Sequence, residues 1–158
     1  MDNSPPAAPE KPFWQAKTLA EMTEAEWESL CDGCGKCCLL LLEEDTMEGE
    51  AVLETSLCCR LFDGATRTCR QYADRHSIVP GCVQVTPANA GTLEWMPESC
   101  AYRRLAEGRS LADWHPLVSG RRESVVEAGI AVPDNLKSEK KVRARHYHRY
   151  VTGVRSTR

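Results

Sequence analysis

The sequence predicts a small, irregular α+β domain with short helices and a short β-hairpin, organised around its cysteines. Three observations lead to this fold class. The chain has 158 residues, which is enough for one ordinary domain. All nine cysteines lie between positions 31 and 100, as in small domains whose core needs an additional cross-link. Short patterned segments, separated by glycine and proline, predict brief elements and no internal repeat.

The two ends of the chain differ from its middle in composition. Residues 1–12 are rich in proline and have no apolar stretch like that of a signal peptide, so they predict a disordered leader. We expect a cysteine-cluster domain over residues 13–132 and a basic tail over residues 133–158. The longest apolar run, at 39–42, is far too short to cross a membrane. A cytoplasmic protein is therefore expected, and disulfides rarely persist in that compartment.

The first ordered helix is predicted just before the cysteines. Thr23 and Glu26 have the spacing of a capping box, in which each side chain bonds the backbone of the other. A short helix should follow, with Trp27 and Leu30 on one face and Cys31 at its C-terminal end. Two glycines in the next four residues then break the helix.

Strand signals follow the cluster. The apolar segments 39–42 and 51–57 flank a turn near Gly49, which predicts a β-hairpin. Residues 70–77 are expected to form one or two helical turns, and residues 83–85 are a candidate strand.

Further helices are predicted in the C-terminal half. The strongest pattern covers residues 97–107, with Cys100 in the first turn and Gly108 as the stop signal. Residues 121–128 are a second, shorter candidate, and the tail from residue 137 is a third.

The stretch CDGCGKCC, residues 31–38, carries the chemistry. Its cysteines form overlapping CxxC motifs, and two intervening residues let a tight loop bring two sulfurs to one metal ion. Zinc binds thiolate sulfur at about 2.3 Å, so four sulfurs must converge. Glycines beside the cysteines let backbone amides donate to the sulfurs, and Lys36 adds a compensating charge. Iron–sulfur clusters use similar motifs. In a bacterial ferredoxin, however, three residues separate the third and fourth cysteines, whereas Cys38 here directly follows Cys37. The spacing does not decide between zinc and iron.

Two pairs of adjacent cysteines need a separate argument. In extended backbone, neighbours such as Cys37 and Cys38 point to opposite sides. They then serve two different ions, or one binds metal while the other packs as a small apolar residue. The same alternatives hold for Cys58 and Cys59.

A structural zinc ion contributes about 10–16 kcal/mol to the stability of a folded domain. This is as much as the roughly 5–15 kcal/mol that stabilises a whole domain. Residues 31–100 should therefore be largely unfolded without metal.

Several longer segments resemble a known family. CDGCGKCC, CRLFD, TCRQYADR, VPGC and LEWMPESCAYRRLAEGRSLADWHPLVSG are similar to the bacterial YcgN proteins of the YkgJ-type CxxCxxCC group. The resemblance runs from about Phe13 to Ile130. It implies a zinc- or iron-chelating domain without a settled activity. The metal ligands that it implies are Cys31, Cys34, Cys37, Cys38, Cys59, Cys69, Cys82 and Cys100. Eight thiols make two four-ligand sites, or one site with spare thiols, and Cys58 falls outside the pattern.

The expected function is metal binding without catalysis. The sequence shows no Ser/His/Asp triad, phosphate-binding glycine loop or dinucleotide fingerprint. One alternative is an iron–sulfur redox protein or enzyme accessory. Another is a zinc-stabilised adaptor for nucleic acid or protein, since residues 137–158 hold eight Lys or Arg, one acid, and Tyr147 and Tyr150. Such a tail also commonly folds back on an acidic body.

A few other side chains were weighed as site residues. His115 could bind metal, but a lone histidine is more often a satisfied structural group. His146 and His148 are one residue apart, so they could share a metal only in a strand. The four arginines Arg103, Arg104, Arg121 and Arg122 are expected mainly to be solvated.

Overall fold

The computed structural model describes residues 10–156, so residues 1–9 of the predicted leader lie outside it. The fold is α+β, as predicted. Strand β2 is the centre of a four-stranded sheet and pairs with β1, β5 and β6. The strands of this sheet are β1 (Leu39–Thr46), β2 (Gly49–Cys58), β5 (Lys137–Ser138) and β6 (Val151–Arg155). A second sheet holds only β3 (Phe62–Asp63) and β4 (Thr68–Cys69).

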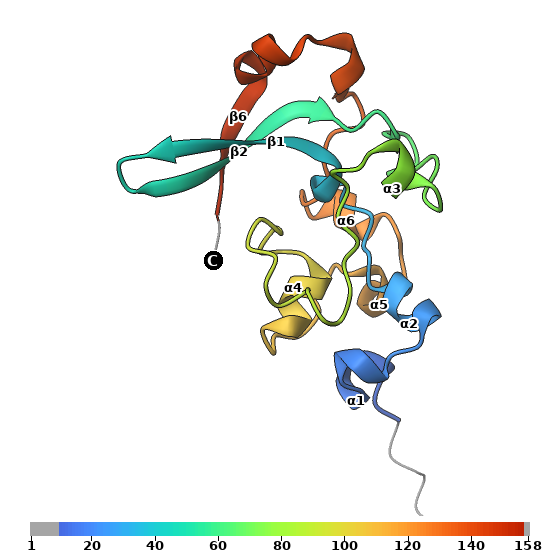
Figure 1. Ribbon diagram of the computed structural model, residues 1–158. Helices are drawn as coiled ribbons and strands as arrows, with labels where there is room; N and C mark the ends of the chain where they lie inside the picture. The colour runs from blue at the N-terminus through green and yellow to red at the C-terminus, as the bar shows by residue number, and fades with distance from the viewer. Residues whose placement is uncertain (1–9, 157–158) are drawn as a thin grey trace, which may run out of the picture.

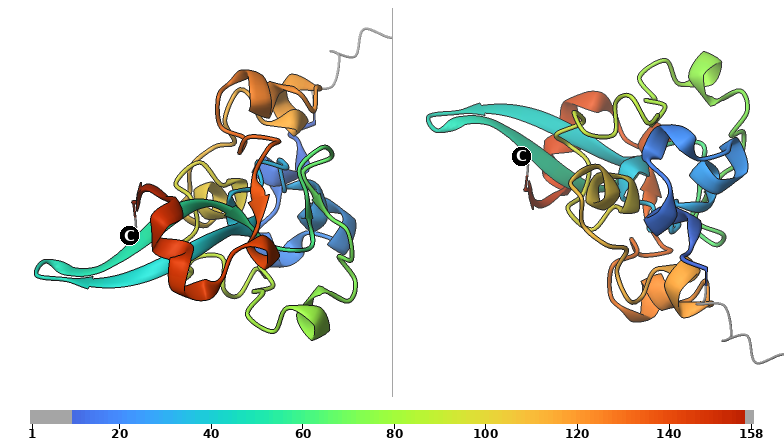
Figure 2. Two further views of the ribbon diagram at one scale, coloured as in Figure 1. Left: turned by 90° about the horizontal axis from the view of Figure 1, so that it is seen from above. Right: turned by 90° about the horizontal axis from the view of Figure 1, so that it is seen from below.

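The predicted hairpin is confirmed, but it is longer than expected. Strands β1 and β2 pair antiparallel from Leu39 opposite Cys58 to Thr46 opposite Gly49. Figures 1 and 2 show that their far end projects from the body of the molecule as an arm. Residues 43–50 of this arm are exposed and include five acids. The strand pairing continues through this exposed segment because backbone hydrogen bonds need no buried face. The apolar pattern alone therefore did not predict the full length of the hairpin.

The helices are short. The α-helices are α1 (Phe13–Ala16), α2 (Glu24–Ser29), α3 (Arg75–Ile78), α4 (Ala101–Ala106), α5 (Pro116–Ser119) and α6 (Ser124–Glu127). The 3-10 helices are η1 (Leu19–Glu21), η2 (Lys36–Cys38), η3 (Glu139–Lys141) and η4 (Ala144–Tyr150). Within residues 10–156, no helix has both the length and the apolar character needed to cross a membrane.

Several expected elements are confirmed and others are corrected. The capping box of Thr23 and Glu26 begins α2, with both reciprocal bonds present. The helix predicted over 97–107 is shorter, because Cys100 has extended backbone and precedes the first helical residue. Residues 83–85 form no strand. Their segment instead accepts a hydrogen bond from the indole of Trp27 at the carbonyl of Val85.

The main hydrophobic core joins α2, the loop before α4, and α4 itself. The ring centroids of Trp27 and Tyr102 lie 4.7 Å apart, and the Tyr102 hydroxyl donates a 2.9 Å hydrogen bond to the Trp27 carbonyl. The buried members are Trp27, Leu30, Ala90, Met96, Ala101, Tyr102 and Leu111. This core anchors both ends of the cysteine region, since α2 leads into Cys31 and α4 follows Cys100.

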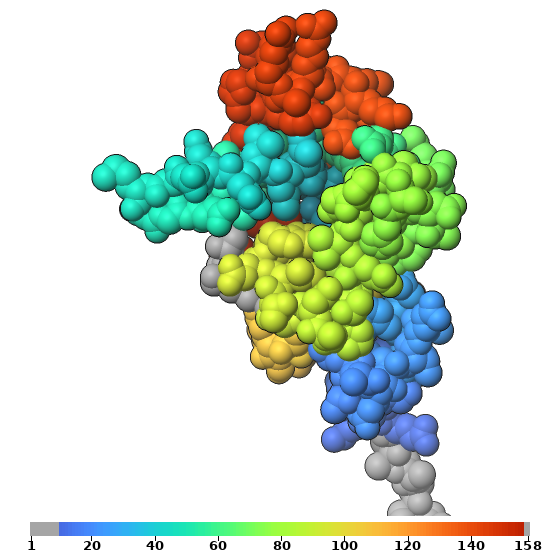
Figure 3. Space-filling view, in the orientation of Figure 1, coloured from blue at the N-terminus to red at the C-terminus, as the bar shows by residue number. Residues whose placement is uncertain are grey.

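The tail folds back on the body, which confirms one of the two alternatives for a basic tail. The prediction of a single helix from residue 137 is wrong, because β5 and β6 both pair with β2. Arg155 is 4% exposed and secures this arrangement. It donates to the Glu54 carboxylate and to the carbonyls of Trp95 and Lys36. The space-filling view shows the part of the tail before β6 lying directly on top of the sheet (Figure 3).

Candidate metal centre

The cysteine loop leaves α2 from a fixed point. Leu30 is fully buried, and its carbonyl accepts a hydrogen bond from Nε2 of the buried His115. Two glycines in left-handed backbone, with φ of 74° and 78°, then turn the chain. At the second, Gly35, an added Cβ would lie 2.7 Å from Val132 and 2.8 Å from Phe62. Only glycine fits this turn, which presses the loop against a small second core.

Six cysteines line one cavity of about 510 Å³. They come from four separate parts of the chain: the cluster loop, the end of β2, strand β4 and the loop after α3. The cysteines lining the cavity are Cys31, Cys37, Cys38, Cys59, Cys69 and Cys82. Most of the remaining wall is apolar, and Glu28, Arg75 and Glu139 are its charged members. All nine cysteines of the chain are free thiols.

Cys34 and Cys100 lie beside these thiols without lining the cavity. Desolvation raises the pKa of Cys34 well above 9, and the neighbouring charges of Cys37 and Cys100 act in the same direction. Desolvation also raises the pKa of Cys100 to about 12, with a smaller contribution from Cys37. We call Cys31, Cys34, Cys37 and Cys100 the first thiol group.

Cys31 and Cys37 complete the electrostatic picture of the first thiol group. Their side chains are exposed because they open onto the cavity, but surrounding protein atoms still desolvate them. Desolvation, followed by the charge of Cys37, raises the pKa of Cys31 to about 12. A hydrogen bond with Cys38, followed by desolvation, raises the pKa of Cys37. As neutral thiols near pH 7, the four side chains lie near one another without like-charge repulsion.

Backbone amides are turned toward the sulfurs, as the glycine-rich motif predicts. The amides of Gly33 and Lys36 bond the sulfurs of Cys31 and Cys34, each two residues earlier. The Leu61 amide donates to the Cys59 sulfur at 3.5 Å. The Cys100 sulfur, at the start of α4, faces the amides of Tyr102 and Arg103. These donors favour the thiolate over the thiol, which is the form that binds metal.

The second thiol group gathers around Cys59. Desolvation raises the pKa of Cys59, and among the smaller contributions are the charges of Cys69 and Cys82. The Cys59 amide donates a 2.8 Å hydrogen bond to the Cys38 carbonyl, which brings Cys38 alongside. The β3–β4 pairing places Cys69 opposite Phe62 and returns it toward Cys59.

The adjacent pairs differ from the expectation based on extended backbone. Cys37 and Cys38 lie in the 3-10 helix η2, and a hydrogen bond joins their thiols. A 3-10 turn does not alternate side chains across the chain as a strand does, so the argument from opposite sides does not apply there. Cys58 is 5% exposed and packs with Phe62 and Val132 in the small second core. It therefore behaves as a buried apolar residue.

Known proteins similar to this chain agree on its family. The family model described as "CxxCxxCC: Putative zinc- or iron-chelating domain" matches residues 30–101. A "UPF0260 protein" of Caulobacter sp. (strain K31) is 56% identical over 82% of this chain and 78% of its own length. The chain belongs to the UPF0260 family. Relatives in Mesorhizobium japonicum and Shewanella denitrificans are 56% and 51% identical, over 82% and 83% of this chain and 86% and 88% of their own lengths. No solved structure matches.

The comparisons confirm the predicted cysteine-cluster group, and the relatives named above are called UPF0260 proteins, which does not test the YcgN name. Among the residues described in this UPF0260 chain, no three Cys, His, Asp or Glu side chains stand close enough together to hold an ion. The donor set nevertheless fits a thiophilic metal, since free thiols, inward amides and a buried unpartnered carboxylate oxygen of Asp32 occur together. The identity of the cysteines that bind the metal stays a prediction.

His115 has a structural role, as favoured. It is 1% exposed, its Nδ1 accepts the Leu117 amide at 3.0 Å, and its Nε2 donates to Leu30 at 2.9 Å. Both ring nitrogens are thus occupied. His146 and His148 lie in the 3-10 helix η4 and not in a strand, the one setting in which they were expected to share a metal.

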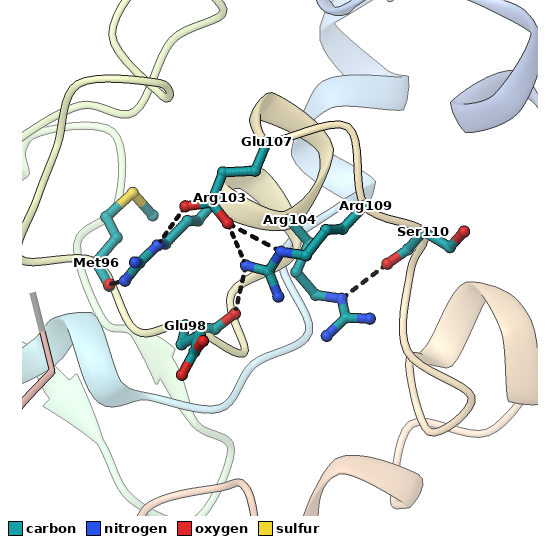
Figure 4. A network of polar contacts seen from close by, with 7 residues as sticks. All are labelled: Met96, Glu98, Arg103, Arg104, Glu107, Arg109 and Ser110. Carbon is teal, nitrogen blue, oxygen red and sulfur yellow. Dashed lines mark hydrogen bonds and ion pairs between the residues drawn. The ribbon is translucent and has the colours of Figure 1, made fainter. Parts of the chain in front are cut away.

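A polar network around α4 was not predicted from the sequence (Figure 4). Arg103 was expected in solvent, but it is buried and donates to Glu107 and to the Met96 carbonyl, both at 2.8 Å. Arg109 joins Glu107 to the Glu98 carbonyl. The network spans the loop on both sides of Cys100. Its only sequence signal was the i,i+4 spacing of Arg103 and Glu107.

Proposed function

We propose that this UPF0260 protein binds zinc or iron through eight cysteine thiolates and acts as a metal-holding protein without catalytic chemistry. The ligands would be Cys31, Cys34, Cys37, Cys38, Cys59, Cys69, Cys82 and Cys100. The observation that carries the proposal is the gathering of six free thiols, from four parts of the chain, around one cavity. The family description as a zinc- or iron-chelating domain agrees with it.

We further propose two centres with four thiols each. The first would use the first thiol group, Cys31, Cys34, Cys37 and Cys100, whose charges influence one another. The second would use Cys38, Cys59, Cys69 and Cys82. The β3–β4 hairpin and the Cys59–Cys38 hydrogen bond bring the first three together, and Cys82 lines the same cavity and influences the pKa of Cys59. The hydrogen bond between the Cys37 and Cys38 thiols makes the two centres neighbours. Cys58 is left out because it packs in the small second core.

Metal binding would draw the sulfurs inward. As the side chains lie, the described residues contain no closed set of ligands, so the cluster loop and the loop after α3 must close on the ion. The bound ion supplies the positive charge that turns protonated thiols into thiolates, which releases protons. A structural zinc site contributes about 10–16 kcal/mol to folding. Chelation should therefore unfold the middle of the chain.

One observation favours an iron–sulfur cluster as a second candidate. The cavity of about 510 Å³ is larger than a single ion requires and most of its wall is apolar. Amide hydrogen bonds to sulfur are also among the features that tune such clusters. In this reading the protein would carry electrons or assist an enzyme.

The deciding experiment is metal analysis of the full chain purified without oxygen. A colourless protein with about two equivalents of zinc or iron, which unfolds on chelation, would support the two-centre proposal. Strong visible charge-transfer absorption with stoichiometric inorganic sulfide would instead support the cluster. A folded protein that takes up neither Zn²⁺ nor Fe²⁺ would overturn both.

Paired variants test the division into two centres. Replacing Cys34 and Cys100 together by serine should remove one equivalent of metal, and replacing Cys69 and Cys82 should remove the other. The matched control is Cys58→Ser, which should keep both equivalents even where it lowers stability. Loss of all metal from either pair would show a single shared centre.

A further inference from the structure

Asp32 stands between two proposed ligands and is nearly inaccessible. Its side chain belongs to a residue that is only 6% exposed. One carboxylate oxygen, Oδ1, accepts the Cys34 amide at 2.9 Å. The other oxygen, Oδ2, is buried and finds no hydrogen-bond partner in the described part of the chain. Half of this carboxylate is therefore satisfied and half is not.

Such an arrangement is costly unless a cation is part of the site. Buried charges in proteins are paired or coordinate metals, because removing a lone carboxylate from water is strongly unfavourable. No Lys, Arg or His of residues 10–156 forms an ion pair with Asp32 within 4.0 Å. The groups that do feel its charge are thiols, namely Cys34, Cys100 and Cys31. All three belong to the first thiol group.

A second aspartate shows what the turn itself needs. Asp63 makes the same contact two residues along the chain, since its Oδ1 accepts the Ala65 amide at 3.0 Å. Its other oxygen lies 3.7 Å from the Arg70 guanidinium, and its side chain is 32% exposed. Shaping this kind of turn thus occupies one oxygen only. At Asp63 the second oxygen faces a cation, which is what Asp32 lacks within the described chain.

We propose that Asp32 is a metal ligand, binding through Oδ2 the ion held by the first thiol group. The inference rests on the proposed function and deepens it, because Oδ2 would take the place of one of the four thiols and make the first centre a mixed sulfur–oxygen site, while the second keeps sulfur alone. Carboxylate oxygen is a harder donor than thiolate and suits zinc and ferrous iron. The two centres would then differ in metal preference and in how tightly they hold their ions.

The test uses Co²⁺ as a probe, titrated without oxygen into the metal-free full chain. Asp32→Asn keeps an oxygen for the Cys34 amide but removes the anionic ligand, and Asp63→Asn is the matched control. We expect D32N to shift the visible Co²⁺ bands of one site and to weaken that site at least tenfold. The other site, and both sites of D63N, should match the original protein. Asp32→Ser, which also keeps a turn acceptor, should reproduce the loss.

The possible results separate the two proposals. If the original chain binds two Co²⁺ and D32N binds both with unchanged spectrum and affinity, Asp32 is a turn residue only and this inference fails alone. If the original chain binds no Co²⁺, the proposed function fails and takes this inference with it.

Discussion

The Nε2 of His115 donates a 2.9 Å hydrogen bond to the carbonyl of Leu30, the residue immediately before the first cysteine. The two residues are 85 positions apart in sequence. The imidazole therefore sets where the cluster loop begins, although it binds no metal in our proposal.

Replacing His115 by phenylalanine should destabilise the protein without changing its ligands. The apolar ring leaves the buried Leu30 carbonyl and the partly buried Leu117 amide unpartnered. A buried group without a partner costs about 1–3 kcal/mol, and a partly buried one costs less. Urea unfolding of the metal-loaded protein measures this loss, with the exposed His148→Phe as control. Loss of one metal equivalent from a folded H115F protein would instead identify His115 as a ligand.

Gly35→Ala should prevent the cluster loop from seating. The new Cβ meets the Phe62 ring and Val132, and the backbone has φ of +78°. Left-handed backbone costs a non-glycine residue roughly 1–2 kcal/mol, and overpacking adds about 1–3 kcal/mol. Thermal unfolding should show a marked decrease relative to Gly153→Ala, where an added Cβ meets nothing within 4 Å. Equal unfolding temperatures would contradict the proposed seating.

Arg155→Met should loosen the tail. The change removes the bonds to Glu54 and to the carbonyls of Trp95 and Lys36 while keeping much of the apolar stem. We expect a loss of about 2–4 kcal/mol in the free energy of unfolding. The exposed Arg149→Met, in the same tail, should change it by less than about 0.5 kcal/mol. A similar small effect from both would show that the contacts of the Arg155 side chain do not hold the tail in place.

Acid should weaken the network around α4 through Glu107. A hydrogen bond from Arg103 holds the pKa of this carboxyl at about 2, below its ordinary 4.5, with help from Arg109. Because the folded-state pKa is the lower one, the contribution is complete above about pH 4.5 and is lost as the pH falls toward 2. Urea unfolding of the original protein and of Glu107→Gln should therefore differ most above pH 4.5 and converge near pH 2. A difference independent of pH would rule out this linkage.

Much of the fold follows from local signals. The capping box of Thr23 predicts α2 because both of its bonds are made between residues three apart. The hairpin follows from two apolar segments around Gly49. The tail does not follow, since the pairing of β6 with β2 depends on Arg155 reaching three partners distant in sequence. The charge pattern allowed for a tail that folds back on the acidic body, but it gives no sign that the tail pairs with β2 as strands.

The candidate site shows the same division. The motif spacing predicts that the sulfurs face one region and that amides point inward, because both depend on the turns at Gly33 and Gly35. It allows that one of Cys58 and Cys59 packs as an apolar residue, but it does not predict that Arg103 is buried or that one oxygen of Asp32 lacks a partner. These properties depend on which residues surround a side chain in three dimensions.

The position of β2 also suggests an order of assembly. It contacts β1 through a turn of a few residues, whereas Glu54 in β2 meets Arg155 in β6 across 101 positions. Closing a long loop costs more chain entropy than closing a short one, and pairings distant in sequence form slowly. During refolding the acidic hairpin should therefore appear first and the last strand dock late, which leaves one edge of β2 open to a second chain in the meantime.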